Sequence, residues 1–129
     1  MNTNPARTDA DKLVQEWADA YNAQDFERFG ALFTDDVAYS VRAYGFAFTG
    51  RDAFVSHIQE YAAAVPDRTL TPKRTIADGD LIAVETAFAG TSSGTVPALP
   101  PAGQPVTASF CTILRLRDGK IASQDDYIG

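Results

Sequence analysis

The sequence of 129 residues contains few of the side chains that form disulfides and metal centres. It has one cysteine, Cys111, and one histidine, His57, so an internal disulfide is excluded and a structural zinc site has too few Cys and His ligands. No apolar run is long enough to span a membrane, and the opening MNTNPARTDADK lacks the hydrophobic core of a signal peptide. We therefore expect a cytoplasmic protein that does not enter a membrane.

Positive charge is also scarce. The chain has 11 Lys and Arg residues against 17 Asp and Glu residues, which gives a formal net charge of -6. The resulting field repels phosphate backbones and anionic lipids, so nucleic acid and membrane partners are not expected. The sequence also lacks the phosphate-binding glycine loop and the dinucleotide-binding GxGxxG motif. Any catalysis is therefore expected to use no cofactor and no metal ion.

The composition is that of an ordinary globular protein. Hydrophobic residues make up 45% of the chain and charged residues 22%, and 129 residues are enough for one buried core. No internal repeat or low-complexity tract divides the sequence. We expect a single domain over residues 1–129, in which residues 1–7 form a flexible N-terminus.

Apolar residues recur first with a helical period and then with a strand period. Thr8 is a candidate N-cap for a first helix that ends near Asn22, and Asp25 begins a second helix that closes at 34–36. A third helix is expected over 50–65. Strands are expected at 37–44, 46–48, 69–77 and 81–90.

The strongest local signal is a hairpin close to the C-terminus. Asp118-Gly119 separates two runs of alternating apolar residues, a pattern typical of a tight turn between antiparallel strands. The alternation places Gln124 and Asp126 on one face of the second strand and Asp125 on the other. One aspartate therefore faces the apolar side of the sheet, where burying a carboxylate is costly and indicates a function.

Three helices followed by antiparallel strands predict an α+β domain. The helices of the N-terminal half are expected to pack on a strongly curved, mainly antiparallel sheet, which gives a cone enclosing a pocket for a small apolar ligand. The segment 91–105 holds four prolines and two glycines in fifteen residues. A loop of this length in a compact domain is commonly functional, and we expect it near the mouth of the pocket.

Several short motifs resemble one family of enzymes. They are Gly90-Thr91 with Gly94, the segment Pro100-Pro101-Ala102-Gly103, the turn Arg115-x-Arg117-Asp118-Gly119-Lys120-Ile121, and an N-terminal pattern from Trp17 through Tyr21-Asn22 and Asp25-Phe26 to Leu32-Phe33-Thr34-Asp35-Asp36. Together they are similar to the SnoaL-like polyketide cyclases of the NTF2-like superfamily, which also includes ketosteroid isomerases and limonene-epoxide hydrolases. The resemblance implies an NTF2-like cone and a homodimer. It leaves the reaction open, because this scaffold hosts cyclases, isomerases, hydrolases and plain binding proteins.

The resemblance also implies where the chemistry takes place. In the cyclases an aspartate of the last strand removes a proton α to a carbonyl, and the enolate closes a ring within the same molecule. That aspartate falls on Asp126, and the epoxide hydrolases have an acidic residue at the same point, so Asp126 is preferred to Asp125. Two histidines of the cyclases are replaced here by Gln124 and Thr112, which can donate hydrogen bonds but cannot shuttle protons near neutral pH.

The catalytic residues of the two other enzymes have no counterparts in this sequence. The base of the ketosteroid isomerases would fall near Val41, and their tyrosine donor near Trp17. The arginine and aspartate of the epoxide hydrolases would fall near Thr86 and Phe88. Neither catalytic set is therefore expected in its usual form.

Other side chains are candidates for the pocket. His57 is expected on the third helix and is a candidate acid, because imidazole titrates near neutral pH, although a histidine at the helix surface fits the pattern as well. Trp17 and Tyr39 carry polar atoms that could contact a substrate carbonyl. The other expected substrate-binding residues are Tyr21, Val41, Tyr61, Phe88, Phe110 and Thr112. Aromatic residues at such spacings are also typical of an ordinary core.

Taken together, these features predict a cofactor-independent enzyme that performs aldol-type ring closure or related proton transfer on a small apolar carbonyl compound, with Asp126, Gln124 and His57 as catalytic residues. One alternative keeps Asp126 but opens an epoxide, by hydrolysis or cyclisation, in natural-product biosynthesis. A second alternative is a non-catalytic small-molecule-binding or assembly module. Ile113 and Ile121 are expected on the outer face of the sheet, where the partner of a homodimer would cover them.

Overall fold

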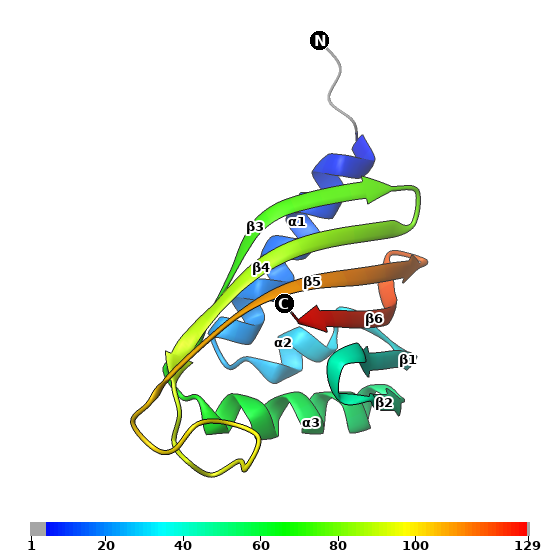
Figure 1. Ribbon diagram of the computed structural model, residues 1–129. Helices are drawn as coiled ribbons and strands as arrows, with labels where there is room; N and C mark the ends of the chain where they lie inside the picture. The colour runs from blue at the N-terminus through cyan, green and yellow to red at the C-terminus, as the bar shows by residue number, and fades with distance from the viewer. Residues whose placement is uncertain (1–4, 129) are drawn as a thin grey trace.

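A six-stranded sheet curves around three helices to form a cone (Figure 1). The structure is a computed structural model and describes residues 5–128. Its elements are α1 (Pro5–Asn22), α2 (Phe26–Gly30), β1 (Phe33–Val41), the short helix η1 (Arg42–Tyr44), β2 (Phe46–Thr49), α3 (Arg51–Ala64), β3 (Thr69–Asp78), β4 (Leu81–Thr91), β5 (Pro105–Arg117) and β6 (Lys120–Ile128). The α+β class with its helices in the N-terminal half is confirmed.

The order of the strands places the C-terminal strand inside the sheet. The order is β2-β1-β6-β5-β4-β3, in which β6 pairs in parallel with β1 and every other pairing is antiparallel. The long strands β3, β4 and β5 arch over α1, while α3 runs beneath β1 and β2 (Figure 1). A carboxylate on β6 therefore lies between strands from both halves of the chain.

Helix α1 begins earlier than the sequence predicts. It starts at Pro5, and proline suits the first turn of a helix because the missing N–H would have no partner there. Thr8 therefore lies within the helix and is not its N-cap. Of the expected flexible segment 1–7, residues 5–7 are helical and residues 1–4 lie outside the described residues. Over residues 5–128, none of the helices is both long enough and apolar enough to cross a bilayer.

The second helix is much shorter than expected. The Asp25 side chain caps it by accepting a hydrogen bond from the backbone N–H of Arg28 at 3.1 Å, but α2 ends at Gly30. Phe33 already belongs to β1, where it pairs with Ile121 of β6. Pairing with a strand that lies far away in the sequence thus overrides the helical spacing of residues 26–33.

The C-terminal hairpin forms as predicted, with one exception. Asp118 and Gly119 both have positive φ, at 52° and 79°, as a two-residue hairpin turn requires. The exception is Ile121, which was expected on the outer face but is 0% exposed. The register shifts between Arg115 and Leu116, so Ile121 pairs with the inward-facing Leu116 and joins the core. Ile121 therefore gives no support to a dimer interface.

The segment between β4 and β5 is folded back on itself. The backbone N–H of Ser92 donates to the carbonyl of Gln104 at 2.9 Å, and that of Gly103 donates to the carbonyl of Ser92 at 2.8 Å. The backbone N–H of Ser93 donates to the carbonyl of Ala64 at 2.9 Å, which fixes the loop to the end of α3. The loop therefore lies beside the C-terminal end of α3 (Figure 1).

Candidate functional site

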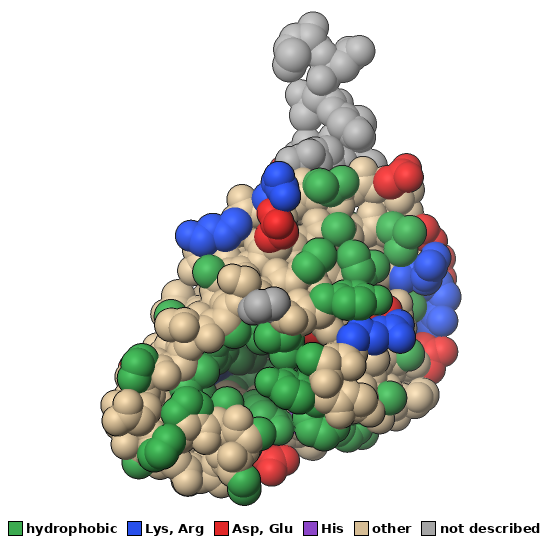
Figure 2. Space-filling model, viewed as in Figure 1, with side chains coloured by type: hydrophobic (Ala, Val, Ile, Leu, Met, Phe, Trp, Pro, Cys, Tyr) green, Lys and Arg blue, Asp and Glu red, His purple; other side chains and the backbone are tan. Residues whose placement is uncertain are grey.

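A cavity of about 340 Å³ lies between α1, α3 and the concave face of the sheet. Figure 2 shows its mouth as a hollow lined by hydrophobic side chains beside the folded loop, to which Leu99 contributes. From the helices come Trp17, Tyr21, His57 and Tyr61. From the strands come Tyr39, Val41, Phe88, Phe110, Thr112, Gln124 and Asp126. The fold thus brings every candidate residue of the sequence analysis to one cavity.

Asp126 is the acidic group of this cavity. Its side chain is buried, with 7% exposure, and β6 places it opposite Thr112 of β5 and Val41 of β1. The hydroxyl of Thr112 donates to Asp126 Oδ1 at 2.8 Å, and the hydroxyl of Tyr39 donates to Oδ2 at 3.0 Å. Gln124 Nε2 donates to Oδ1 at 3.3 Å. Three neutral donors therefore hold the carboxylate.

The surroundings of Asp126 favour its uncharged form. Burial raises the pKa of the Asp126 carboxyl, and this effect outweighs the hydrogen bonds from Thr112, Tyr39 and Gln124, which act in the opposite direction. Among the cavity-lining residues that the structure describes there is no Lys or Arg to offset the charge. The result is a carboxylate that binds protons more strongly than an exposed one.

The neighbouring aspartate faces the other way. Asp125 Oδ1 accepts a hydrogen bond from the Ser40 hydroxyl at 2.5 Å and lies 3.6 Å from Arg42 Nη2. Alternation along β6 thus places Asp125 outside the cavity and Asp126 inside it.

Trp17 and Gln124 form a hydrogen bond behind the carboxylate. Trp17 Nε1 donates to Gln124 Oε1 at 3.1 Å. Because an indole N–H can only donate, it fixes the amide oxygen toward Trp17 and turns the amide nitrogen toward Asp126. The polar atoms of Trp17 and Tyr39, which we expected to contact a substrate carbonyl, are thus bound to Gln124 and Asp126 in this structure.

His57 lies in an aromatic part of the cavity wall. The centre of its ring is 4.6 Å from that of Phe48, 4.9 Å from Tyr61 and 5.8 Å from Tyr39. Partial burial lowers the pKa of His57, against a smaller opposing effect of Glu60. The imidazole is therefore neutral at pH 7, and Tyr39 links it to Asp126, since the Tyr39 ring contacts His57 while its hydroxyl donates to the carboxylate.

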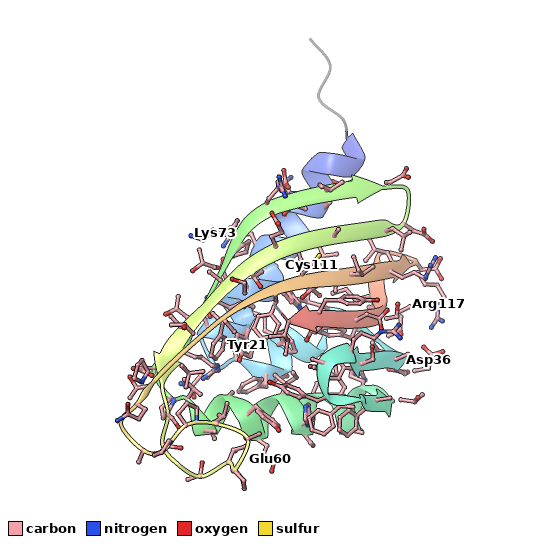
Figure 3. All side chains as sticks on the ribbon, viewed as in Figure 1. Tyr21, Asp36, Glu60, Lys73, Cys111 and Arg117 are labelled. Atoms are coloured by element: carbon pink, nitrogen blue, oxygen red, sulfur yellow. The ribbon has the colours of Figure 1, made fainter. Side chains whose placement is uncertain are left out.

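The cavity also contains residues that the sequence analysis did not assign to a ligand site. They are Phe29, Tyr44, Phe46, Ile58, Val65, Leu70, Thr86, Leu99, Val106, Thr107, Ala108 and Ile128. Tyr21, at the end of α1, projects into the cone in Figure 3. The sequence pattern could have identified Thr86 as a cavity residue, because Thr86 interrupts the inward-facing apolar series of its strand. Across the part of the chain with described side chains, no group of three His, Cys, Asp or Glu residues is placed to hold a metal ion.

A curved sheet closed by helices around a buried carboxylate defines a small α+β domain with an internal ligand cavity. Residues 14–124 match the SnoaL-like domain family, so this chain belongs to that family. No curated protein sequence matches the chain.

Solved structures share this fold across almost the whole chain. A protein of Jannaschia sp. CCS1, provisionally named a SnoaL-like polyketide cyclase, has a TM-score of 0.86 at 19% identity, covering 99% of this chain and 90% of its own. IdmH of Streptomyces antibioticus, provisionally named a polyketide cyclase, has a TM-score of 0.78 at 25% identity. The match covers 92% of this chain and 91% of IdmH. A protein of Kribbella flavida, provisionally named a ketosteroid isomerase, has a TM-score of 0.74 at 24% identity. The match covers 95% of this chain and 78% of that protein. These likenesses establish an NTF2-like fold.

Proposed function

We propose that this protein is a cofactor-independent enzyme in which Asp126 is the general base for aldol-type ring closure, or related proton transfer, on a small apolar carbonyl compound. The observation that carries the proposal is the carboxylate itself, buried in a cavity rich in aromatic side chains, with no Lys or Arg among the described residues that line it. A carboxylate whose pKa is raised is a stronger base than an exposed one. The polyketide cyclase names of two structural neighbours are consistent with this chemistry.

The reaction balances without a co-reactant. Asp126 takes the proton from the carbon α to a carbonyl, and the electron pair of the broken C–H bond forms the enolate. The enolate carbon attacks a second carbonyl carbon of the same molecule, which forms a C–C bond and moves an electron pair onto the second oxygen. That oxygen takes the proton back from Asp126, so the product is a cyclic alcohol and the carboxylate is restored.

The neighbouring side chains have roles that follow from their protonation states. Burial and the charge of Asp126 raise the pKa of Tyr39, so this phenol remains a hydrogen-bond donor. Tyr39 and Thr112 hold the carboxylate while it is charged, and their hydroxyls can turn to the substrate oxygen once Asp126 has taken the proton. His57 is neutral and serves as a hydrogen-bonding part of the wall. Gln124 orients the carboxyl group and is itself oriented by Trp17.

The pH dependence of proton exchange tests the base. We expect the protein to accelerate incorporation of deuterium at the α carbon of α-tetralone, a neutral bicyclic ketone, in D2O followed by NMR. Since only the ionised carboxylate can take a proton, the rate should be low in acid and rise through one ionisation. The midpoint should lie above the ordinary carboxyl pKa of about 4, because burial raises the pKa of Asp126.

The same experiment separates the enzyme from a binding protein. Gln124 and Thr112 cannot carry protons at neutral pH, so a site that binds without turnover is the second candidate function. If α-tetralone shifts the NMR signals of the cavity residues but exchanges no faster than in buffer at any pH, the binding protein is the better description.

We also propose that the outer face of the sheet forms a homodimer interface. Ile76 of β3, Ala83 of β4 and Ile113 of β5 lie side by side in the strand register, and Ile76 is 56% exposed. Figure 2 shows hydrophobic side chains grouped over this part of the sheet. An apolar row across a broad sheet is suited to packing against a second copy of the chain.

We expect analytical ultracentrifugation at micromolar concentration to give a dimer for the wild type and a folded monomer for Ile113→Glu, since a carboxylate in the interface would be desolvated. A monomeric wild type, or an Ile113→Glu protein that remains dimeric, would contradict this interface.

A further inference from the structure

Thr86 is a polar residue in an otherwise apolar wall. Strand β4 points Ile82, Val84, Thr86 and Phe88 toward the interior, and the first three are 1%, 0% and 3% exposed. Thr86 and Phe88 line the cavity. The hydroxyl of Thr86 is thus the one departure from an apolar series on this face of the strand.

That hydroxyl has no hydrogen-bond partner among the described residues. Thr86 Oγ1 is buried and unpaired, whereas the hydroxyl of Thr112 on the adjacent strand donates to Asp126. A buried hydroxyl without a partner destabilises a fold relative to a valine of the same shape. Threonine is therefore a poor choice for folding at this position. Because the hydroxyl makes no bond, a turn of the side chain about χ1 to another staggered position breaks none.

The strand register fixes where this hydroxyl lies relative to the base. Thr86 pairs with Phe110, and Thr112 is two residues further along β5 on the same face. Thr86 and Thr112 are therefore diagonal neighbours, separated by about 7–8 Å between their backbones. Thr112 in turn contacts Asp126. A ligand with one oxygen near Asp126 would reach Thr86 with a second oxygen on the far side of a fused ring system.

The charge of the cavity limits what this second oxygen can be. Its described lining contains the buried carboxyl of Asp126 and no Lys or Arg. A second carboxylate would therefore be repelled and would lose its hydration without a compensating cation. A hydroxyl or keto oxygen carries no such cost.

We propose that Thr86 is a specificity residue, which selects substrates bearing a second, uncharged hydroxyl or keto oxygen on the side of the molecule that lies against β4. The inference rests on the proposed function in that the first oxygen lies at Asp126. Its test measures binding alone. The selectivity of Thr86 can therefore be absent while Asp126 exchanges protons, and Asp126 can fail to exchange protons while the selectivity is present.

The test compares three probes with the wild type and one variant. The probes are α-tetralone, its derivative with a hydroxyl on the far ring, and the corresponding derivative with a carboxylate at that carbon. We expect the hydroxyl compound to bind the wild type about five- to tenfold more tightly than α-tetralone, as one net hydrogen bond allows. The carboxylate should bind more weakly than either. Thr86→Val should remove the advantage of the hydroxyl compound, so that this variant binds the hydroxyl compound and α-tetralone about equally.

Two further variants and one stability measurement keep the result interpretable. Thr86→Ser retains the hydroxyl and should retain the preference. Thr34→Val changes a buried threonine of β1 outside the cavity and should leave the preference for the hydroxyl compound unchanged. Without ligand, Thr86→Val should unfold at a higher temperature than the wild type, because it removes an unpaired buried hydroxyl. Equal binding of the two neutral probes by the wild type, no binding of either, or a preference that survives in Thr86→Val would overturn the proposal.

Discussion

Asp126→Asn is expected to lower the rate of α-proton exchange by about 10²- to 10⁴-fold, the usual contribution of a positioned general base. The amide of asparagine has the size of the carboxyl group but cannot take a proton. It can still accept the hydrogen bond that Thr112 donates, so the cavity should keep its shape. We therefore expect the affinity for α-tetralone, measured by NMR titration, to stay within a few-fold of the wild type.

Asp125→Asn is the matched control for this change. Asp125 adjoins Asp126 in the sequence but bonds to Ser40 outside the cavity, so its loss should change the exchange rate little. An Asp126→Asn protein that binds α-tetralone and still accelerates its exchange would show that Asp126 is not the base. Equal losses in both variants would point to a general effect on the sheet.

Asp126→Asn should also be more stable than the wild type at neutral pH. The unfolded chain has an ordinary carboxyl pKa of about 4, whereas burial raises the pKa of Asp126 in the folded protein. Below pH 4 the group is protonated in both states and costs nothing. As the pH rises, the unfolded state ionises first, so the stability of the wild type falls until the folded pKa is passed.

Urea unfolding at acidic and neutral pH measures this difference. We expect the two proteins to converge in acid and Asp126→Asn to have the higher urea midpoint at pH 7. The opposite order at pH 7 would mean that the hydrogen bonds from Tyr39, Thr112 and Gln124 outweigh burial and lower the pKa of Asp126. The carboxylate would then be a weaker base than the mechanism requires.

Much of the candidate site could be predicted because strands alternate. Placing Asp126 and Gln124 together on one face of β6 needs only a period of two, and the family resemblance selected Asp126 rather than Asp125 for the inner face. The rule failed for Ile121, because the register shift leaves Ala122 as an extra residue in β6, which reverses the alternation between Ile121 and Ser123 and also brings Asp126 opposite Thr112. No residue in that stretch, such as an extra glycine, marks the shift in the sequence.

The long-range part of the site could not be predicted from local patterns. Tyr39 reaches Asp126 because β1 pairs in parallel with β6, and a parallel pairing has no turn motif to identify it. The hydrogen bond from Trp17 to Gln124 likewise joins residues that are 107 positions apart. Local spacing and the family resemblance together predicted that these side chains line a pocket, but neither could show that they bind one another.

Phe54→Ala is expected to cost about 3–5 kcal/mol of the free energy of unfolding, a large share of the roughly 5–15 kcal/mol that holds a domain together. Phe54 is 0% exposed on α3. The centre of its ring lies 4.8 Å from that of Phe33, 6.0 Å from Phe29 and 4.6 Å from Tyr39. Removing it would leave a cavity against α2 and β1 that the surrounding rings cannot fill without leaving their own contacts.

Phe46→Ala is the control for Phe54→Ala, because Phe46 is 38% exposed at the rim of the cavity. This substitution should cost about 1 kcal/mol or less of the free energy of unfolding. Urea unfolding followed by fluorescence of Trp17 measures both variants. Tyr39 rests on Phe54 with its ring and holds Asp126 with its hydroxyl, so any Phe54→Ala protein that remains folded should also exchange α protons more slowly. Equal urea midpoints for the two variants would show that α3 does not close the cone through Phe54.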